Sequence, residues 1–170
     1  MNSSNSLEII VADVSTEEAR VKQVVQQARE ESDSLFIGRF LTDLCFSEAD
    51  ERMEQGPSIV VRQYGNSCWV NASSNLADAY RAELGLEEAR DAVVSGRYST
   101  VYLSQVLNTV AEDLLAAADL KELIELCPAH LRLVMTGDHL PAGFAESTAP
   151  QRGHCSTETA VNTLSEFPPP

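Results

Sequence analysis

The fold class of this chain is decided by one stretch near its beginning, Ile9-Ile10-Val11-Ala12-Asp13-Val14-Ser15-Thr16-Glu17-Glu18. Its first half is short, apolar and rich in β-branched residues, which is typical of a buried parallel strand. Its second half carries the polar residues that begin helices. We therefore expect a strand at residues 7–14 that turns tightly into a helix. In nucleotide-binding α/β folds this turn holds phosphates, yet here it has neither glycine nor lysine.

The residues that follow the turn have helical spacing. Ser15 is predicted to be the N-cap, and Glu18, three residues later, completes a capping box. The apolar stripe behind it consists of Val21, Val24, Val25 and Ala28. Residual phosphate binding at Ser15 and Thr16 is the alternative for this turn, and the sequence leaves it open.

The rest of the chain alternates between strand and helix patterns. Further strands are expected at residues 35–41, 58–64, 100–103 and 131–136, with a long helix at 74–95, two helical pieces before Pro128 and a short helix at 141–149. Leu76, Tyr80 and Leu84 are predicted to line one side of the long helix, and Gly85 to bend it. This alternation predicts an α/β fold, an open and mostly parallel sheet with helices on both faces.

Length and composition favour one domain. We expect a polar leader at residues 1–6, a single α/β domain at 7–150 and a flexible, polar C-terminal tail at 151–170. The formal net charge of −14 argues against binding to nucleic acid or to an anionic membrane. The four cysteines are widely spaced, which suits reduced thiols. With no apolar targeting or membrane-spanning run, the expected location is cytoplasmic.

Three motifs carry a resemblance to a known family. They are Arg62-Gln63-Tyr64-Gly65-Asn66-Ser67-Cys68-Trp69, then Ala92-Val93-Val94-Ser95-Gly96-Arg97-Tyr98, then the run from Leu126 to Pro141 that contains Pro128-Ala129-His130 and Thr136-Gly137-Asp138. In order and spacing, residues 7–150 resemble the ATP:corrinoid adenosyltransferases of the P-loop type. The resemblance implies a three-layer sandwich like that of P-loop NTPases and a cytoplasmic homodimer. It also implies transfer of the 5′-deoxyadenosyl group of ATP to reduced cobalt in a corrinoid such as cobalamin.

The same resemblance implies where the ligands would lie. ATP would rest on a glycine-rich loop after the first strand, and Mg²⁺ beside an acidic pair after the fourth. The corrinoid would contact a loop that corresponds to Ser67, Cys68 and Trp69, which are therefore the candidate corrinoid-facing residues. A lone tryptophan in a loop can instead cover a core edge or lie in an interface.

The chain departs from the family where the chemistry should be. The turn from Ala12 to Thr16 lacks the P-loop glycines and lysine, and two carboxylates follow it. After the fourth strand, Leu103-Ser104-Gln105 replaces the family's L-D-E, so both candidate Mg²⁺ ligands are lost. Asp138 replaces the arginine of T-G-R. We therefore expect binding of ATP and Mg²⁺ to be weak or absent.

Two other groups could carry chemistry. A zinc site could be drawn from Cys127, His130, His154 and Cys155, but their spacing is irregular. His139 beside Asp138 could form an acid–base pair or a solvated pair in a loop.

The sequence leaves three functional hypotheses. The leading one is a degenerate homologue that binds a corrinoid, regulates or dimerises. The rival is an active adenosyltransferase with an atypical nucleotide site. The third is a structural partner of an intact paralogue.

Overall fold

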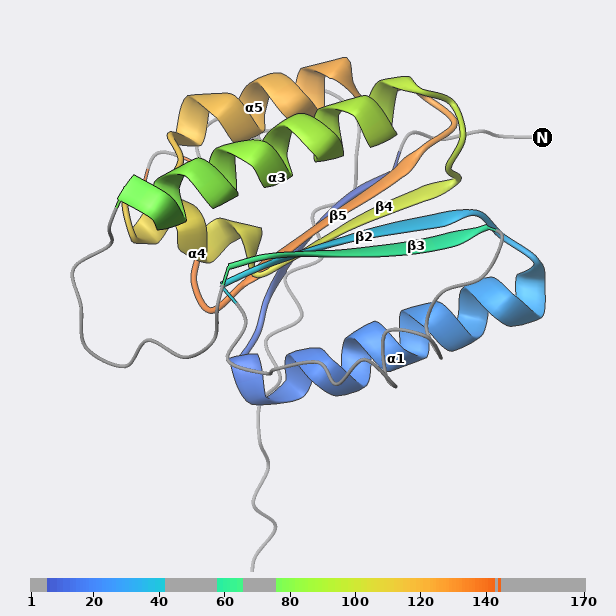
Figure 1. Cartoon of the computed structure of the whole chain (residues 1–170). Helices are drawn as coiled ribbons and strands as arrows, with labels where there is room; N and C mark the ends of the chain where they lie inside the picture. Colours follow the sequence, from blue (N-terminus) through green and yellow to red (C-terminus); the bar gives the residue numbers. More distant parts are fainter. Residues whose placement is uncertain (1–5, 42–57, 66–75, 143, 145–170) are drawn as a thin grey trace, which may run out of the picture.

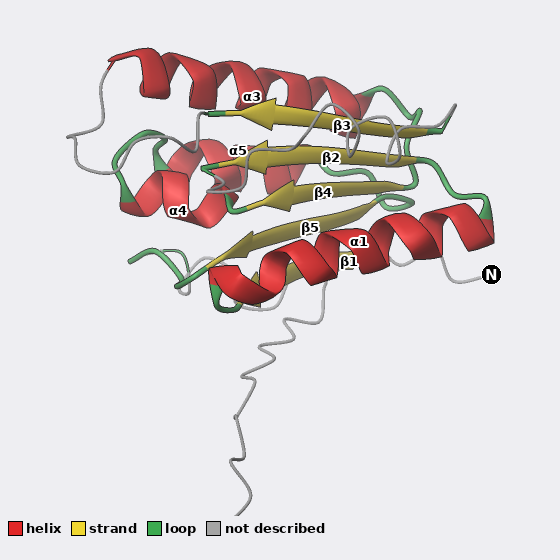
Figure 2. Ribbon diagram, turned by 60° about the horizontal axis from the view of Figure 1, so that its bottom comes forward, coloured by secondary structure: helices red, strands yellow, loops and turns green. Residues whose placement is uncertain are grey.

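A computed structural model describes residues 6–41, 58–65, 76–142 and 144 of the 170-residue chain. Its centre is a five-stranded sheet in the order β1-β5-β4-β2-β3, and every neighbouring pair is parallel (Figure 2). The strands are β1 (Ser6–Val11), β2 (Leu35–Phe40), β3 (Ile59–Tyr64), β4 (Thr100–Ser104) and β5 (Arg132–Gly137). The open parallel sheet that the sequence predicts is confirmed.

Helices cover both faces of this sheet, which makes three layers (Figure 1). They are α1 (Val14–Glu31), α3 (Leu76–Val94), α4 (Val106–Ala111) and α5 (Ala117–Leu126). The connection from β1 to β2 runs one way along the sheet, whereas those from β3 to β4 and from β4 to β5 run back. Because parallel crossovers are right-handed, opposite directions place α1 on one face and the other three helices on the opposite face.

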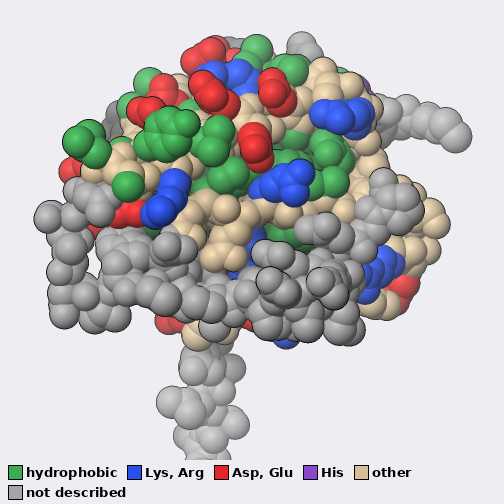
Figure 3. Space-filling model, in the orientation of Figure 1, with side chains coloured by type: hydrophobic (Ala, Val, Ile, Leu, Met, Phe, Trp, Pro, Cys, Tyr) green, Lys and Arg blue, Asp and Glu red, His purple; other side chains and the backbone are tan. Residues whose placement is uncertain are grey.

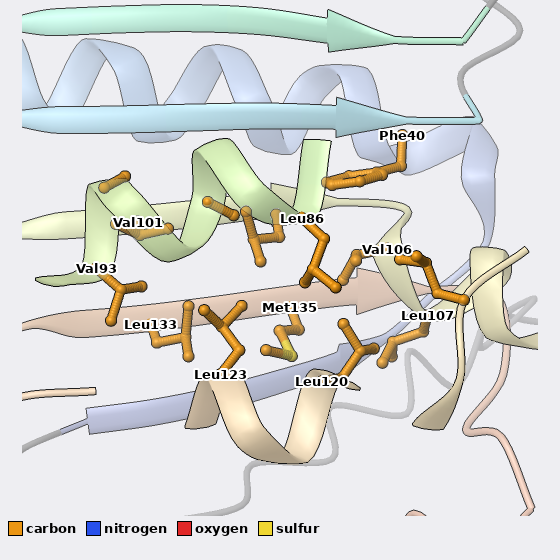
Figure 4. Close-up of a cluster of buried hydrophobic side chains, with 14 of the residues drawn as sticks. Phe40, Leu86, Val93, Val101, Val106, Leu107, Leu120, Leu123, Leu133 and Met135 are labelled. Carbon is orange, nitrogen blue, oxygen red and sulfur yellow. The ribbon is translucent and has the colours of Figure 1, made fainter. Parts of the chain in front are cut away.

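Two apolar clusters hold the layers together. The cluster under α3, α4 and α5 includes Phe40, Leu86, Val93, Val101, Val106, Leu107, Leu120, Leu123, Leu133 and Met135 (Figure 4). The cluster under α1 includes Ile10, Val21, Val25, Leu35, Ile37, Tyr102 and Val134. Successive residues of one strand alternate between the two, since Val101 and Leu103 face one cluster and Tyr102 the other.

Gly85 lies within α3 and has a packing role. A Cβ atom at this position would lie 2.7 Å from ring atoms of both Phe40 and Tyr64. These two rings contact each other in a tilted arrangement, with centroids 5.2 Å apart and an interplanar angle of 41°. The Tyr64 hydroxyl donates a hydrogen bond to Glu88. The helix continues without a break from Leu76 to Val94, and Gly85 allows its close approach to the sheet. The bend at Gly85 stays a prediction.

The predicted side of the long helix is wrong in its first half. Leu76, Tyr80 and Leu84 are 92%, 66% and 39% exposed. Most residues that face the core are small, namely Ala82, Gly85, Ala89 and Ala92, and they are joined there by Leu86 and Val93. At Gly85 the helix lies against the rings of Phe40 and Tyr64, and the larger side chains of Leu76, Tyr80 and Leu84 lie on its exposed side.

Several predicted segments fall outside the described residues. These are most of the leader at residues 1–6, most of the helix expected at 141–149 and the whole tail at 151–170. In the part of the chain that the structure describes, no helix has the length and apolar character needed to cross a membrane.

Candidate functional site at the carboxyl ends of the strands

The turn between β1 and α1 is built around Asp13. Its carboxylate accepts a 2.7 Å hydrogen bond from the Ser15 backbone N–H, and its carbonyl oxygen accepts from the backbone N–H (3.0 Å) and hydroxyl (2.8 Å) of Thr16. Hydrogen bonds from the side chain and backbone of Ser15 hold the pKa of Asp13 below its usual value. A negative group thus accepts hydrogen bonds at the turn where a phosphate would be expected.

The N-cap of α1 is therefore Asp13, and the prediction of Ser15 is wrong. Aspartate is as strong an N-cap as serine, and it comes two residues earlier in the chain. The helix begins at Val14, so Ser15 and Thr16 lie in its first turn, where both are exposed. Glu18 is consequently free of the capping box that the sequence suggested.

Glu17 is buried beneath the same turn, with only 5% of its surface exposed. Its Oε1 atom accepts three hydrogen bonds, from the hydroxyls of Tyr102 (3.1 Å), Ser104 (2.7 Å) and Thr136 (2.8 Å). The Thr136 hydroxyl oxygen also accepts from the Gln105 backbone N–H at 2.9 Å. We call the three hydroxyls the hydroxyl cradle. The chain's own carboxylate occupies it.

The same carboxylate affects its phenolic neighbour. Burial, with a further contribution from the charge of Glu17, raises the pKa of Tyr102 well above its ordinary value. Tyr102 therefore keeps its proton and remains a hydrogen-bond donor to Glu17 throughout the physiological pH range.

Glu18 is held by a different strand. Its Oε2 atom accepts a 2.8 Å hydrogen bond from Nη2 of Arg39, a residue of β2 that is only 2% exposed. Arg39 pairs across the sheet with Ser104, so this ion pair lies beside the hydroxyl cradle. A buried guanidinium requires a partner, and Glu18 supplies one. The carboxylates of Glu17 and Glu18 thus join the beginning of α1 to the carboxyl ends of the central strands.

Gln105, at the end of β4, presents a donor where a metal would need an acceptor. Its backbone is left-handed (φ 60°), and its Oε1 atom accepts a hydrogen bond from the Asn108 side chain. Its Nε2 atom is buried and has no hydrogen-bond partner among the described residues. Mg²⁺ binds oxygen ligands, usually carboxylates beside phosphates. The Ser104–Gln105 pair therefore does not fit this ion.

Asn108 ties α4 to β5 on the same side. Its Oδ1 atom accepts a 2.9 Å hydrogen bond from the Asp138 backbone N–H. A Cβ atom at Gly137 would lie 2.5 Å from the Leu107 Cβ, so only glycine permits this approach. The side chains of Asp138 and His139 are exposed.

The other candidates are only partly described. Ser67, Cys68 and Trp69 lie outside the described residues, as do His154 and Cys155 of the possible zinc set. Within the described ranges, no group of three or more histidine, cysteine, aspartate or glutamate side chains is arranged to hold a metal ion.

The sequence analysis did not predict the hydrogen bond of Tyr102 to Glu17 or the ion pair of Arg39 with Glu18. The sequence nevertheless contains a signal for each. Glu17 lies four residues before Val21 and so extends the buried stripe of α1 toward the sheet. Arg39 interrupts an otherwise apolar strand, which indicates a buried charge that needs a partner.

Comparison with known proteins gives one family. The family model described as ATP:corrinoid adenosyltransferase BtuR/CobO/CobP matches residues 19–149, about three quarters of the chain. The match begins directly after Glu18, so the turn at Asp13 and the carboxylate of Glu17 lie outside it. A search of curated proteins found no significant match.

Proposed function

This chain belongs to the ATP:corrinoid adenosyltransferase family, and we propose that it is a member whose nucleotide site is degenerate. In this proposal the protein does not bind ATP with Mg²⁺ in the manner of the family. It acts instead as a corrinoid-binding, regulatory or dimerising homologue. The observation that carries the proposal is the Glu17 carboxylate, which fills the hydroxyl cradle at the head of α1.

The first support is electrostatic. A triphosphate seated on the first turn of α1 would lie beside the N-cap carboxylate of Asp13 and over the buried carboxylate of Glu17, with Glu18 next in the helix. Two like charges about 4 Å apart repel by roughly 4 kcal/mol at an effective dielectric constant of about 20. Arg39, a buried cation among the described residues, is already paired with Glu18.

The second support is the donor inventory of the turn. Phosphate loops work because free backbone N–H groups and a lysine point at the anion. Here the N–H groups of Ser15 and Thr16 both donate to Asp13. Ser104 and Gln105 also fit Mg²⁺ poorly. The turn between β1 and α1 and the end of β4 therefore lack the lysine, the free N–H groups and the metal ligands that a nucleotide site would use.

A corrinoid is the ligand that family membership favours for the remaining function. We propose Ser67, Cys68 and Trp69 as the residues that contact it, and Ser15 and Thr16 as the remnant of the phosphate loop. A homodimer, or a complex with an intact paralogue, completes the proposal. Light scattering after gel filtration, with and without a candidate paralogue, tests that assembly.

The corrinoid proposal is tested by titration with hydroxocobalamin. We expect a shift in the visible spectrum of the corrinoid and quenching of the fluorescence of Trp69, the only tryptophan. The Trp69→Ala variant should lose the spectral shift while keeping the far-UV circular dichroism of the wild type. An unchanged corrinoid spectrum at saturating protein would contradict corrinoid binding.

The alternative function is active adenosyl transfer through an atypical nucleotide site, which family membership favours. A reduced corrinoid, ATP and Mg²⁺ are mixed with the protein, and formation of the cobalt–carbon bond is followed by its visible spectrum. We expect no conversion above the protein-free control. Conversion that requires both protein and Mg²⁺ would favour the enzyme.

A further inference from the structure

The outer side of α3 exposes apolar side chains that the core does not use. We define the α3 outer face as Leu76, Tyr80 and Leu84, which are 92%, 66% and 39% exposed. They are spaced four positions apart in the sequence, so they align along one side of the helix. In Figure 3 apolar side chains gather at the left, over the first half of α3 as it lies in Figure 1. A surface of this kind is typical of an interaction site.

Negative charges border this face. Glu83, Glu87 and Asp91 are all exposed, and each lies three or seven residues beyond a member of the α3 outer face. The arginines of the same helix are engaged elsewhere, since Arg81 pairs with Asp78 and Arg90 with Glu122. None of the three border carboxylates takes part in a salt bridge formed by the described residues.

The acidic border and the small apolar area of the α3 outer face together indicate what kind of partner binds there. Two copies of a chain with net charge −14 would bring the same acidic borders together, which opposes self-association through this face. Three side chains also fall short of the roughly 800 Å² per partner that stable interfaces bury. One amphipathic helix, by contrast, needs only a few apolar anchors and gains from cationic neighbours.

We propose that the α3 outer face docks a basic amphipathic helix of another protein. The apolar side of that helix covers Leu76, Tyr80 and Leu84, and its lysines or arginines face the acidic border. This proposal does not depend on whether the chain binds ATP or a corrinoid.

The test uses a labelled synthetic peptide of about 18 residues, or five helical turns, with leucines on one side and lysines on the other. Fluorescence anisotropy with the full-length protein is expected to give a Kd in the micromolar range. The double variant Leu76→Ser, Tyr80→Ser should weaken binding about tenfold or more. Leu126→Ser, which removes another exposed leucine on α5, should change the Kd by less than about twofold.

A second pair of variants separates local from general charge attraction. Glu83→Gln with Glu87→Gln should weaken peptide binding severalfold. Glu30→Gln with Glu31→Gln removes the same charge from α1, on the opposite side of the sheet, and should have little effect. Equal weakening by the two pairs, or no effect of the serine variants, would overturn the proposal.

Other occupants of the face have their own signatures. A wild-type dimer in sedimentation experiments that Tyr80→Ser converts to monomer would show that a second copy docks there. A fall in Tm of more than about 4 °C in the serine double variant would show that the chain's own core uses the face. Either result overturns the proposal. An oligomeric state and a Tm that the serine variants leave unchanged support it.

Discussion

At the scale of single residues, Glu17 is the centre of the account. A carboxylate that is 5% exposed and accepts three hydroxyl hydrogen bonds is part of the folded core. It joins the first turn of α1 to β4 and β5. The residue that we propose to oppose phosphate binding therefore also joins α1 to the sheet in the fold.

Replacement of Glu17 tests this structural role. Glu17→Ala leaves three buried hydroxyls without their common acceptor, and we expect a loss of about 2 to 4 kcal/mol in the free energy of unfolding. Glu17→Gln retains an acceptor oxygen and should lose less. Urea denaturation measures both, with the exposed Glu31→Ala as the control. An alanine variant as stable as the wild type would show that the cradle does not depend on Glu17.

The raised pKa values of two buried tyrosines determine how we expect the free energy of unfolding to change at alkaline pH. Burial, with contributions from Glu17 and Glu88 respectively, raises the pKa values of Tyr102 and Tyr64 above 10.0. Between pH 10 and the raised values, the unfolded chain loses these protons while the folded chain keeps them. Stability is thus fully present below about pH 10 and falls as the pH rises further.

Absorbance of tyrosinate and the free energy of unfolding, both measured from about pH 9 to about 11.5, check this expectation. The Tyr102→Phe variant should lose stability less steeply with pH than the wild type. An identical dependence of stability on pH in the variant and the wild type would contradict a raised pKa at Tyr102.

Cys127 gives a third test at this scale. Burial raises the pKa of its thiol to about 11, and the thiolate is the reactive form. We expect iodoacetamide at pH 8 to alkylate Cys127 about 100-fold more slowly in the native protein than in urea. Mass spectrometry of the peptide that contains it gives both rates. Equal rates would show that the thiol is not shielded by the fold.

At the scale of elements, α3 shows why helical spacing alone did not predict burial. Apolar residues lie on two of its sides, and the sequence pattern does not say which side meets the sheet. The structure resolves this through Gly85 and its alanine neighbours, which allow the rings of Phe40 and Tyr64 to pack closely. The larger Leu76 and Tyr80 are left at the surface.

The Gly85→Ala variant tests this packing. Intrinsic helix propensity favours alanine by about 1 kcal/mol. We nevertheless expect the variant to be less stable by about 1 to 3 kcal/mol, because its Cβ atom would meet two aromatic rings at 2.7 Å. Thermal and urea unfolding measure the change, and the exposed Asp91→Ala is the control on the same helix. A more stable Gly85→Ala protein would refute the close contact.

At the scale of the whole molecule, the sequence predicted the fold well because parallel sheets have strong patterns. Apolar strands alternate with helices, and this alternation predicts a mostly parallel sheet with helices on both faces, which the structure confirms. The site was predicted only in part. The lack of phosphate-loop glycines and lysine can be read directly from residues 12–16, but the contact of Glu17 with Tyr102 joins positions 85 residues apart. No local pattern specifies such a pairing.

We propose that this member of the family has filled its phosphate site with its own carboxylates. Isothermal titration calorimetry of the wild-type protein with ATP, in the presence and absence of Mg²⁺, tests that claim most directly. The account predicts no saturable heat up to about 1 mM nucleotide in either condition. Mg²⁺-dependent binding with a Kd in the micromolar range would contradict it.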